Sequence, residues 1–224
     1  MAPNRTASKS PPRKAGPETG TIPMGTRAQR AAERRDAILA AALDEFAAQG
    51  FAAARLDDVA KRAGVAKGTI YLYFADKETL FQELIRAQLS PVVGGVIHAS
   101  HAELPLRMFV EQLIEVFVRE VLGTRRKDVI RLIITEGPRF PKLAEFYYRE
   151  VIARVMEAVR GLLRRALERG ELKDDALLKH PQLLAAPGIM AIVWSGLFER
   201  FEPLDVRSLM RAHFEMLFGK EGAS

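Results

Sequence analysis

The sequence predicts an all-α fold, with a small N-terminal three-helix unit followed by a larger helical domain. Apolar residues recur at three- and four-residue spacing through most of the 224-residue chain, and no stretch alternates as a strand does. Prolines and glycines separate these periodic segments. Hydrophobic residues make up 48% of the chain, which is enough for one substantial core or two smaller ones.

Residues 1–25 are predicted to be a disordered basic tail. They are rich in Pro, Ser, Thr, Gly, Lys and Arg and hold almost no large apolar side chain, so burial cannot offset their chain entropy. Ordered structure is expected to begin at Thr26, as the N-cap of the first helix.

The first helix is predicted over residues 27–49, with Ile38, Ala42 and Phe46 on one stripe and Gly50 at its end. Two short helices follow, over residues 56–63 and 67–74, joined by a turn around Gly64. A fourth helix is expected to begin after an N-cap at Asp76.

The fourth helix is expected to end or bend at Pro91, Gly94 and Gly95. Helical periodicity then resumes, and the breaks fall at Pro138, Pro141, Gly170 and Pro203. The predicted helices cover residues 104–122, 125–136, 140–169, 176–200 and 204–218. An alternative start for the helix over residues 176–200 is after Pro181 or after Pro187.

Two short helices joined by a tight glycine turn and packed on a longer helix are the parts of a helix-turn-helix motif, here about residues 56–75. Its second helix typically enters the major groove of DNA. Its outer face would present Lys67, Gly68, Thr69, Tyr71 and Tyr73. The residues expected to face the three-helix core are Leu56, Val59, Ala63, Val65, Ile70 and Phe74.

The stretch FAAQGFAAARLDDVAKRAGVAKGTIYLYFADKETLFQEL resembles the DNA-binding domain of the TetR/AcrR family of bacterial transcriptional regulators. The resemblance covers about residues 33–93 and implies a TetR-type helix-turn-helix domain there. It also implies that residues 98–218 bind an effector and dimerise.

Carried over position by position, the resemblance implies base-edge contacts for Lys67, Gly68 and Tyr71. It implies phosphate contacts for Thr69, Tyr73 and Lys77. The sequence departs from the family pattern at two places. Ala54 and Arg55 stand where the family usually has Ser or Thr at the start of the second helix, and Ala66 stands where it usually has Ser or Thr after Gly-Val. These departures remove two hydroxyl groups that cap helices or meet phosphates. Arg55 is able to replace a phosphate contact by its charge.

The resemblance also implies that some of the apolar residues on the middle helices line an effector pocket. By periodicity alone the same residues are simply core. The pocket candidates are Phe109, Leu113, Phe117, Arg131, Ile134 and Tyr147, with Glu136, His98 and His101 as further polar anchors.

The charge pattern is consistent with contact to a polyanion. Residues 1–80 hold 13 Lys and Arg against 9 Asp and Glu, and the remainder of the chain holds 21 against 19. The same bias would arise if it served only solubility. The first reading agrees with double-stranded operator DNA as the partner.

Composition excludes several classes of site. Without cysteine there is no disulfide framework and no thiolate metal site. The four histidines are scattered and do not favour a metal centre, so neither metal nor cofactor is expected. The chain shows no apolar span and no secretory signal, which predicts a cytoplasmic protein that does not enter the membrane.

Together with the helix-turn-helix motif, the family resemblance implies a homodimeric repressor that leaves its operator when it binds a small hydrophobic effector. The alternative is a helical small-molecule-binding protein or enzyme without operator binding. No phosphate loop and no nucleophile–base arrangement favours an enzyme, so enzymatic activity is not expected. The resemblance implies a dimer contact on the last two helices, about residues 182–200 and 204–218. Their apolar faces fit a four-helix contact and carry Leu183, Ile189, Ile192, Val193, Leu197, Leu209, Phe214 and Leu217.

Overall fold

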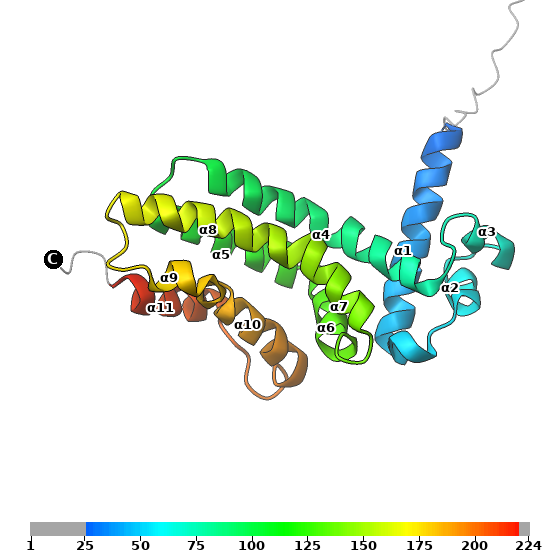
Figure 1. Ribbon diagram of the computed structural model, residues 1–224. Coiled ribbons are helices and arrows are strands. Elements are labelled where there is room, and N and C mark those ends of the chain that lie inside the picture. The colour runs from blue at the N-terminus through cyan, green and yellow to red at the C-terminus, as the bar shows by residue number, and fades with distance from the viewer. Residues whose placement is uncertain (1–25, 220–224) are drawn as a thin grey trace, which may run out of the picture.

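The computed structural model describes residues 26–219, and all regular elements within that range are helices. The predicted disordered tail, residues 1–25, lies outside the described residues. Three helices form the N-terminal unit: α1 (Arg27–Ala53), α2 (Leu56–Arg62) and α3 (Lys67–Tyr71). From this unit α4 (Lys77–His101) runs along a larger helical bundle (Figure 1).

The bundle consists of α4 and the helices that follow it. Two of its segments, η1 and η2, are π-helical and one, η3, is a 3₁₀ helix. In chain order the remaining elements are α5 (Leu106–Val116), η1 (Phe117–Leu122), α6 (Arg126–Glu136), α7 (Pro141–Tyr147), η2 (Tyr148–Ile152), α8 (Ala153–Glu168), α9 (Ala176–Lys179), η3 (Pro181–Leu184), α10 (Ala186–Leu197) and α11 (Val206–Phe218).

Helix α1 begins as predicted, at a capping box in which the Thr26 side chain accepts from the Gln29 amide and the Gln29 side chain accepts from the Thr26 amide. Its apolar stripe is fully covered, with Ile38, Ala42 and Phe46 at most 1% exposed. Gly50 has a φ of 71°, so the helix breaks direction there. Helical structure then resumes as far as Ala53, beyond the predicted end.

The predicted break in α4 is wrong, because the helix continues through Pro91, Gly94 and Gly95 to His101. Proline removes only one amide donor, and packing on both sides of it holds the helix together. Leu89 and Val93 are buried, and α4 lies along α8 over much of its length. Tertiary packing therefore outweighs the local preference of these residues.

Two later segments also differ from the prediction. The helix predicted over residues 140–169 runs without a gap, but its middle, η2, has the wider π-helical turn. The helix predicted over residues 176–200 is broken into α9, η3 and α10. Pro181 begins η3, and Pro187 lies in the first turn of α10, where no amide donor is needed.

The core consists of two buried clusters. The larger joins the N-terminal unit to α6 and α7, and its centre is aromatic. Phe51 packs against Phe46, Phe81 and Phe140, with ring centroids 4.8–5.6 Å apart. The smaller cluster lies between α5, α8 and α11 and includes Phe109 and Phe214. The larger cluster therefore packs the N-terminal unit directly against the bundle.

Two residues of the predicted dimer face belong to this core instead. Ile192 is 1% exposed and Phe214 is 4% exposed. Both side chains lie on the inner faces of α10 and α11, which pack against the rest of the protomer, whereas Ile189 and Leu197 remain exposed.

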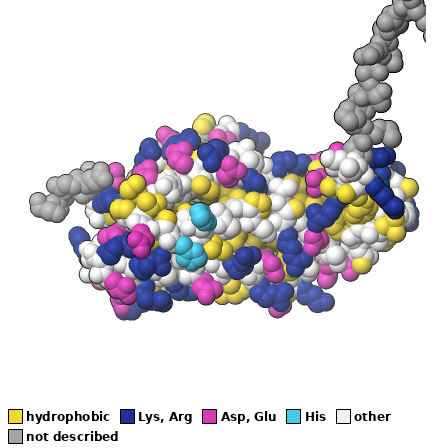
Figure 2. Space-filling view, turned by 90° about the horizontal axis from the view of Figure 1, so that it is seen from above, with side chains coloured by type: hydrophobic (Ala, Val, Ile, Leu, Met, Phe, Trp, Pro, Cys, Tyr) yellow, Lys and Arg dark blue, Asp and Glu magenta, His cyan; other side chains and the backbone are white. Residues whose placement is uncertain are grey.

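The surface carries acidic and basic side chains intermixed, as Figure 2 shows for the face seen from above. His98 and His101 are exposed on the last turns of α4. Within residues 26–219, no group of three or more His, Asp or Glu is arranged to hold a metal ion. Over the same residues, no helix is long and apolar enough to cross a membrane.

Candidate DNA-reading surface and effector cavity

The turn between α2 and α3 is built by Gly64, which has a φ of 67°. The Val65 amide donates to the Ala60 carbonyl, and the Gly64 amide donates to the Lys61 carbonyl. These two bonds form a Schellman motif, which satisfies the last carbonyls of α2 and requires a left-handed residue. The glycine turn therefore sets the angle between the two short helices.

The inner face of the motif agrees with the predicted core. Val59, Ile70 and Phe74 are at most 1% exposed. The three other predicted core residues are partly buried against the same cluster: Leu56, Ala63 and Val65.

The outer face of α3 presents three of the predicted contact residues. Lys67, Gly68 and Tyr71 are exposed, and the Tyr71 side chain is 48% exposed. Thr69 is half-buried, and Tyr73 is half-buried against the core cluster beside Phe74. The structure thus brings Lys67, Gly68 and Tyr71 to one surface and leaves Thr69 and Tyr73 at its border.

Sequence reasoning missed Leu72, which is 84% exposed at the end of α3. The signal was present in the sequence. Residue 72 lies two positions from both Ile70 and Phe74, which are buried, so helical geometry turns it away from the core.

Lys67 is held by an ion pair within the motif. Its Nζ atom lies 2.7 Å from Oδ2 of Asp57, in the first turn of α2. The hydrogen bond that Lys67 donates to Asp57, and the negative charge of Asp57, raise the pKa of Lys67 above its ordinary value. Lys67 therefore stays cationic, and Asp57 directs it along the outer face.

The two helices of the motif lack side-chain caps, as the substitutions at positions 55 and 66 predicted. Arg55 is the N-cap of α2 and Ala66 is the N-cap of α3, and neither side chain accepts from the helix amides. The Arg55 side chain is exposed beside the same surface. By contrast, Asp76 caps α4 by accepting from the Thr79 amide at 2.7 Å.

Lys77 has a structural role that the sequence did not predict. Its ammonium donates to the carbonyls of Phe51 at 2.8 Å, Ala52 at 2.7 Å and Ala54 at 3.4 Å. It also lies 4.9 Å from the centre of the Phe51 ring. Lys77 therefore satisfies carbonyls at the end of α1 and ties α4 to the N-terminal unit.

A cavity of about 190 Å³ lies in the bundle, between α4, α5, α8 and α10. Apolar side chains make nearly all of its wall, and none of its lining residues carries a charge. The lining residues are Leu89, Val92, Val93, Val96, Leu113, Val116, Phe117, Val121, Ile130, Tyr147, Val151, Ile152, Val155, Met156, Val159, Pro181, Leu184, Ala185, Gly188, Ile189, Ile192 and Met210.

Half of the predicted pocket residues line this cavity, namely Leu113, Phe117 and Tyr147. Phe109 does not, because it is buried in the smaller core cluster. Ile134 is 41% exposed on α6.

The predicted charged and polar anchors are likewise outside the wall. Arg131 donates to Ser195 Oγ at 2.9 Å and pairs with Asp128, so its guanidinium is engaged between α6 and α10. His98, His101 and Glu136 do not line the cavity either. Sequence periodicity identified the apolar helix faces but not the place where they leave a gap.

Both π-helical segments contribute to the cavity wall. η1 supplies Phe117 and Val121, and η2 supplies Val151 and Ile152. Such widened turns are rare in proteins and frequently occur at functional sites. Here they lie on two sides of one cavity.

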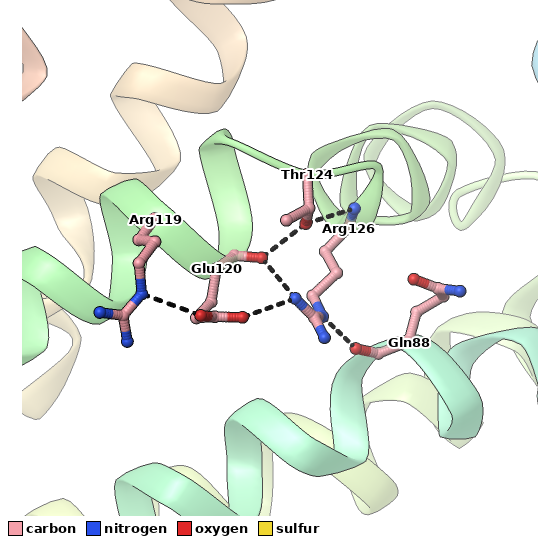
Figure 3. A network of polar contacts seen from close by, with 5 residues as sticks. All are labelled: Gln88, Arg119, Glu120, Thr124 and Arg126. Carbon is pink, nitrogen blue, oxygen red and sulfur yellow. Dashed lines mark hydrogen bonds and ion pairs between the residues drawn. The ribbon is translucent and has the colours of Figure 1, made fainter.

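A network at the end of η1 connects this wall to α4 (Figure 3). The Arg126 guanidinium donates to the Gln88 carbonyl of α4 at 2.7 Å and to the Glu120 carbonyl of η1 at 2.9 Å. Thr124 donates to the same Glu120 carbonyl at 2.6 Å. The network thus joins a cavity wall to the helix that carries Lys77 at its other end.

Comparison with known proteins gives consistent matches. Residues 38–84 match the family described as bacterial regulatory proteins, tetR family. Residues 105–213 match the family described as tetracyclin repressor-like, C-terminal domain.

Two curated relatives extend these matches. The chain is 31% identical over 151 residues to the HTH-type transcriptional repressor BepR of Brucella suis biovar 1, covering 65% of this chain and 71% of that protein. It is 27% identical over 175 residues to the HTH-type transcriptional regulator AcrR of Shigella flexneri, covering 76% of this chain and 81% of that protein.

Solved structures share the fold. A complex of SmeT with triclosan superposes with a TM-score of 0.71 at 18% identity, covering 85% of this chain and 93% of that one. FadR of Bacillus subtilis, in complex with stearoyl-CoA, superposes with a TM-score of 0.68 at 19% identity, covering 82% of this chain and 97% of that one.

Proposed function

Because the chain belongs to the TetR family of bacterial transcriptional regulators, we propose that it is a repressor that leaves its operator when an apolar effector fills the cavity. One observation carries this proposal. Helix α4 is bonded to the N-terminal unit through Lys77, and it also supplies residues that line the cavity, from Leu89 to Val96. A ligand that shifts α4 would therefore act on α1, against which α2 packs, and α3 packs on α2 in turn.

For DNA recognition, we assign α3 to the major groove. Lys67, Gly68 and Tyr71 would meet base edges, and exposed Leu72 adds an apolar group suited to a thymine methyl. The phosphate contacts would come from residues around this surface: Arg55, Thr69, Tyr73 and Lys77.

For the effector, the apolar wall favours a hydrophobic compound. The triclosan and stearoyl-CoA complexes named above concern SmeT and FadR, and they support only the idea that this fold accommodates such molecules. An effector weakens DNA binding only if it prefers the conformation in which the reading helices are wrongly spaced.

The dimer contact is proposed on α10, the loop after it and α11. Leu197 is 60% exposed, Phe201 is 69% exposed and Met216 is 77% exposed, an unusual concentration of bare apolar side chains. A second copy would cover them and would place two reading helices on half-sites about 34–36 Å apart, or a multiple of that.

Sedimentation tests this arrangement. Leu197→Glu should turn the dimer into a monomer, whereas Met108→Glu, at a comparably exposed apolar position on α5, should leave it a dimer. A Leu197→Glu protein that still sediments as a dimer would remove this face from consideration.

The proposed site of action is the cytoplasm, where operator DNA is found, and no catalytic role is proposed. The alternative of a binder or enzyme without operator recognition gains no support, since the relatives described above are named as transcriptional regulators. The test is selection of binding sites from random DNA, followed by operator titration with hydrophobic compounds. A regulator enriches one palindromic sequence and loses affinity for it with at least one compound that binds the protein.

A further inference from the structure

The wall of the cavity contains one side chain with an oxygen or nitrogen atom, that of Tyr147 at the end of α7. Among residues 26–219 the Tyr147 hydroxyl has no hydrogen-bond partner. A hydroxyl without a partner in the protein is free to donate a hydrogen bond to a ligand. Tyr147 is thus the one polar group available to orient a molecule in this cavity.

The protonation state of Tyr147 fixes its role as a donor. A tyrosine hydroxyl is already neutral at physiological pH, and burial raises the pKa of this one to about 12, which keeps it protonated over a still wider range. A neutral phenol donates one hydrogen bond, and a ligand carbonyl or ether oxygen would accept it.

The absence of charge in the wall excludes ionic ligands. Arg131, the nearest predicted cationic anchor, is engaged with Ser195 and Asp128 outside the lining. A carboxylate that entered the cavity would lose its hydration and find no cation to replace it. The ligand class is therefore neutral.

The volume of the cavity and the rings in its wall further restrict the class of ligand. A dry engineered cavity of about 150 Å³ binds benzene, so about 190 Å³ accommodates one substituted ring. Phe117 and Tyr147 both line the space, and aromatic rings favour edge and offset contacts with a further ring.

We propose that the cavity binds a neutral compound with a single aromatic ring and one hydrogen-bond acceptor, which accepts a hydrogen bond from the Tyr147 hydroxyl. This inference rests on the proposed function, since it names the effector class of the same cavity.

Three probes of nearly equal shape test it: acetophenone, α-methylstyrene and benzoate. They differ in having a carbonyl, a methylene or a carboxylate at one position. Calorimetry with the full chain measures the affinity of each for the wild type and for Tyr147→Phe, which removes only the hydroxyl. The ratio of acetophenone to α-methylstyrene affinity should fall by about five- to tenfold in the variant, the loss of one hydrogen bond. Benzoate should bind neither protein measurably.

A second variant locates the binding site. A Cβ atom at Gly188 would lie 3.1 Å from the Phe117 ring, so Gly188→Ala should press that ring into the cavity. Acetophenone and α-methylstyrene should then both bind about tenfold more weakly, because the filled space costs each ligand alike.

Three results would overturn the proposal: an unchanged ratio in Tyr147→Phe, benzoate binding as tight as that of acetophenone, or no binding by any probe. Operator titration with acetophenone separates this question from the function. If acetophenone binds as predicted and operator affinity does not change, the ligand class stands and the proposed release mechanism fails.

Discussion

Gly64 and Gly68 lie four residues apart in the helix-turn-helix motif, and the structure uses them for different reasons. Gly64 has a positive φ that closes the turn, whereas Gly68 is helical on the exposed face of α3. A Cβ atom at either position would meet no atom within 4 Å in this chain. A methyl group at either position would therefore not clash within the protein. The two positions differ in their backbone conformation and in how closely we expect DNA to approach them.

Gly64→Ala should destabilise the protein by about 1 kcal/mol, because alanine resists the left-handed conformation. Gly68→Ala should stabilise it by about 0.5–1 kcal/mol, because alanine favours a helix. The same Gly68→Ala change should weaken operator binding by about tenfold, since its methyl group crowds the base edges. Urea unfolding, followed by the fluorescence of the single Trp194, and DNA titration measure the two effects. Undiminished operator affinity in Gly68→Ala would mean that α3 does not approach DNA closely.

Lys77 combines a predicted DNA contact with an observed structural contact. Lys77→Ala should lower stability by about 1–3 kcal/mol, because the carbonyls of Phe51 and Ala52 lose their donor. It should also lower the salt slope of DNA binding by about 1.

The control for Lys77 is Lys67→Ala, which removes an exposed cation from the reading face. It should leave the unfolding curve nearly unchanged and flatten base preference at particular operator positions. If Lys77→Ala unfolds like the wild type, the capping role inferred from its hydrogen bonds is wrong.

Residue chemistry made the division between the buried and exposed faces of α3 largely predictable. Helical spacing separated Ile70 and Phe74 from Lys67 and Tyr71, and burial in the structure agrees with that separation. The role of Lys77 was not predictable, since its carbonyl partners lie 23–26 residues away in sequence. Only the fold brings them together.

At the scale of elements, the connection between η1 and α4 depends on Arg126. Its guanidinium bonds two carbonyls, one on each element, and only 20% of its side chain is exposed. Pro91 has already removed one amide from the nearby turn of α4. Arg126 therefore adds a hydrogen bond to α4 at Gln88, next to the Ala87 carbonyl that the missing Pro91 amide would have bonded.

Arg126→Met keeps the length of the side chain and removes its donors. Stability should fall by about 2 kcal/mol, and a ligand bound in the cavity should lose most of its effect on operator affinity. Arg119→Met is the matched control, because Arg119 is 72% exposed and bonds only Glu120 in the same network. Titrating operator with and without ligand measures the coupling. Full ligand response in Arg126→Met would exclude this route.

Element boundaries were less predictable than element existence. The periodic apolar pattern identified nearly all the long helices, but Pro91 and the glycines after it suggested an end that packing against α8 overrides. The π-helical turns of η1 and η2 carry no sequence signal, because their side chains satisfy ordinary helical spacing. The cavity wall depends on those turns, so its membership could not be derived from sequence alone.

For the whole molecule, the central claim is that one continuous helix couples an apolar cavity to a DNA-reading surface. The aromatic cluster around Phe51 and Phe140 makes a second connection between the two parts. Movement at the cavity is therefore expected to reach α3 through packed side chains rather than through a flexible linker.

The most direct test is fluorescence anisotropy on an operator selected from random DNA, titrated with the full chain at several salt concentrations, with and without a cavity ligand. The account predicts specific binding that weakens steeply with salt and a ligand that lowers operator affinity at least tenfold. Leu113→Trp, which fills the cavity, should abolish the ligand effect and leave ligand-free operator affinity nearly intact. A ligand shown to occupy the cavity that leaves operator affinity unchanged would contradict the account.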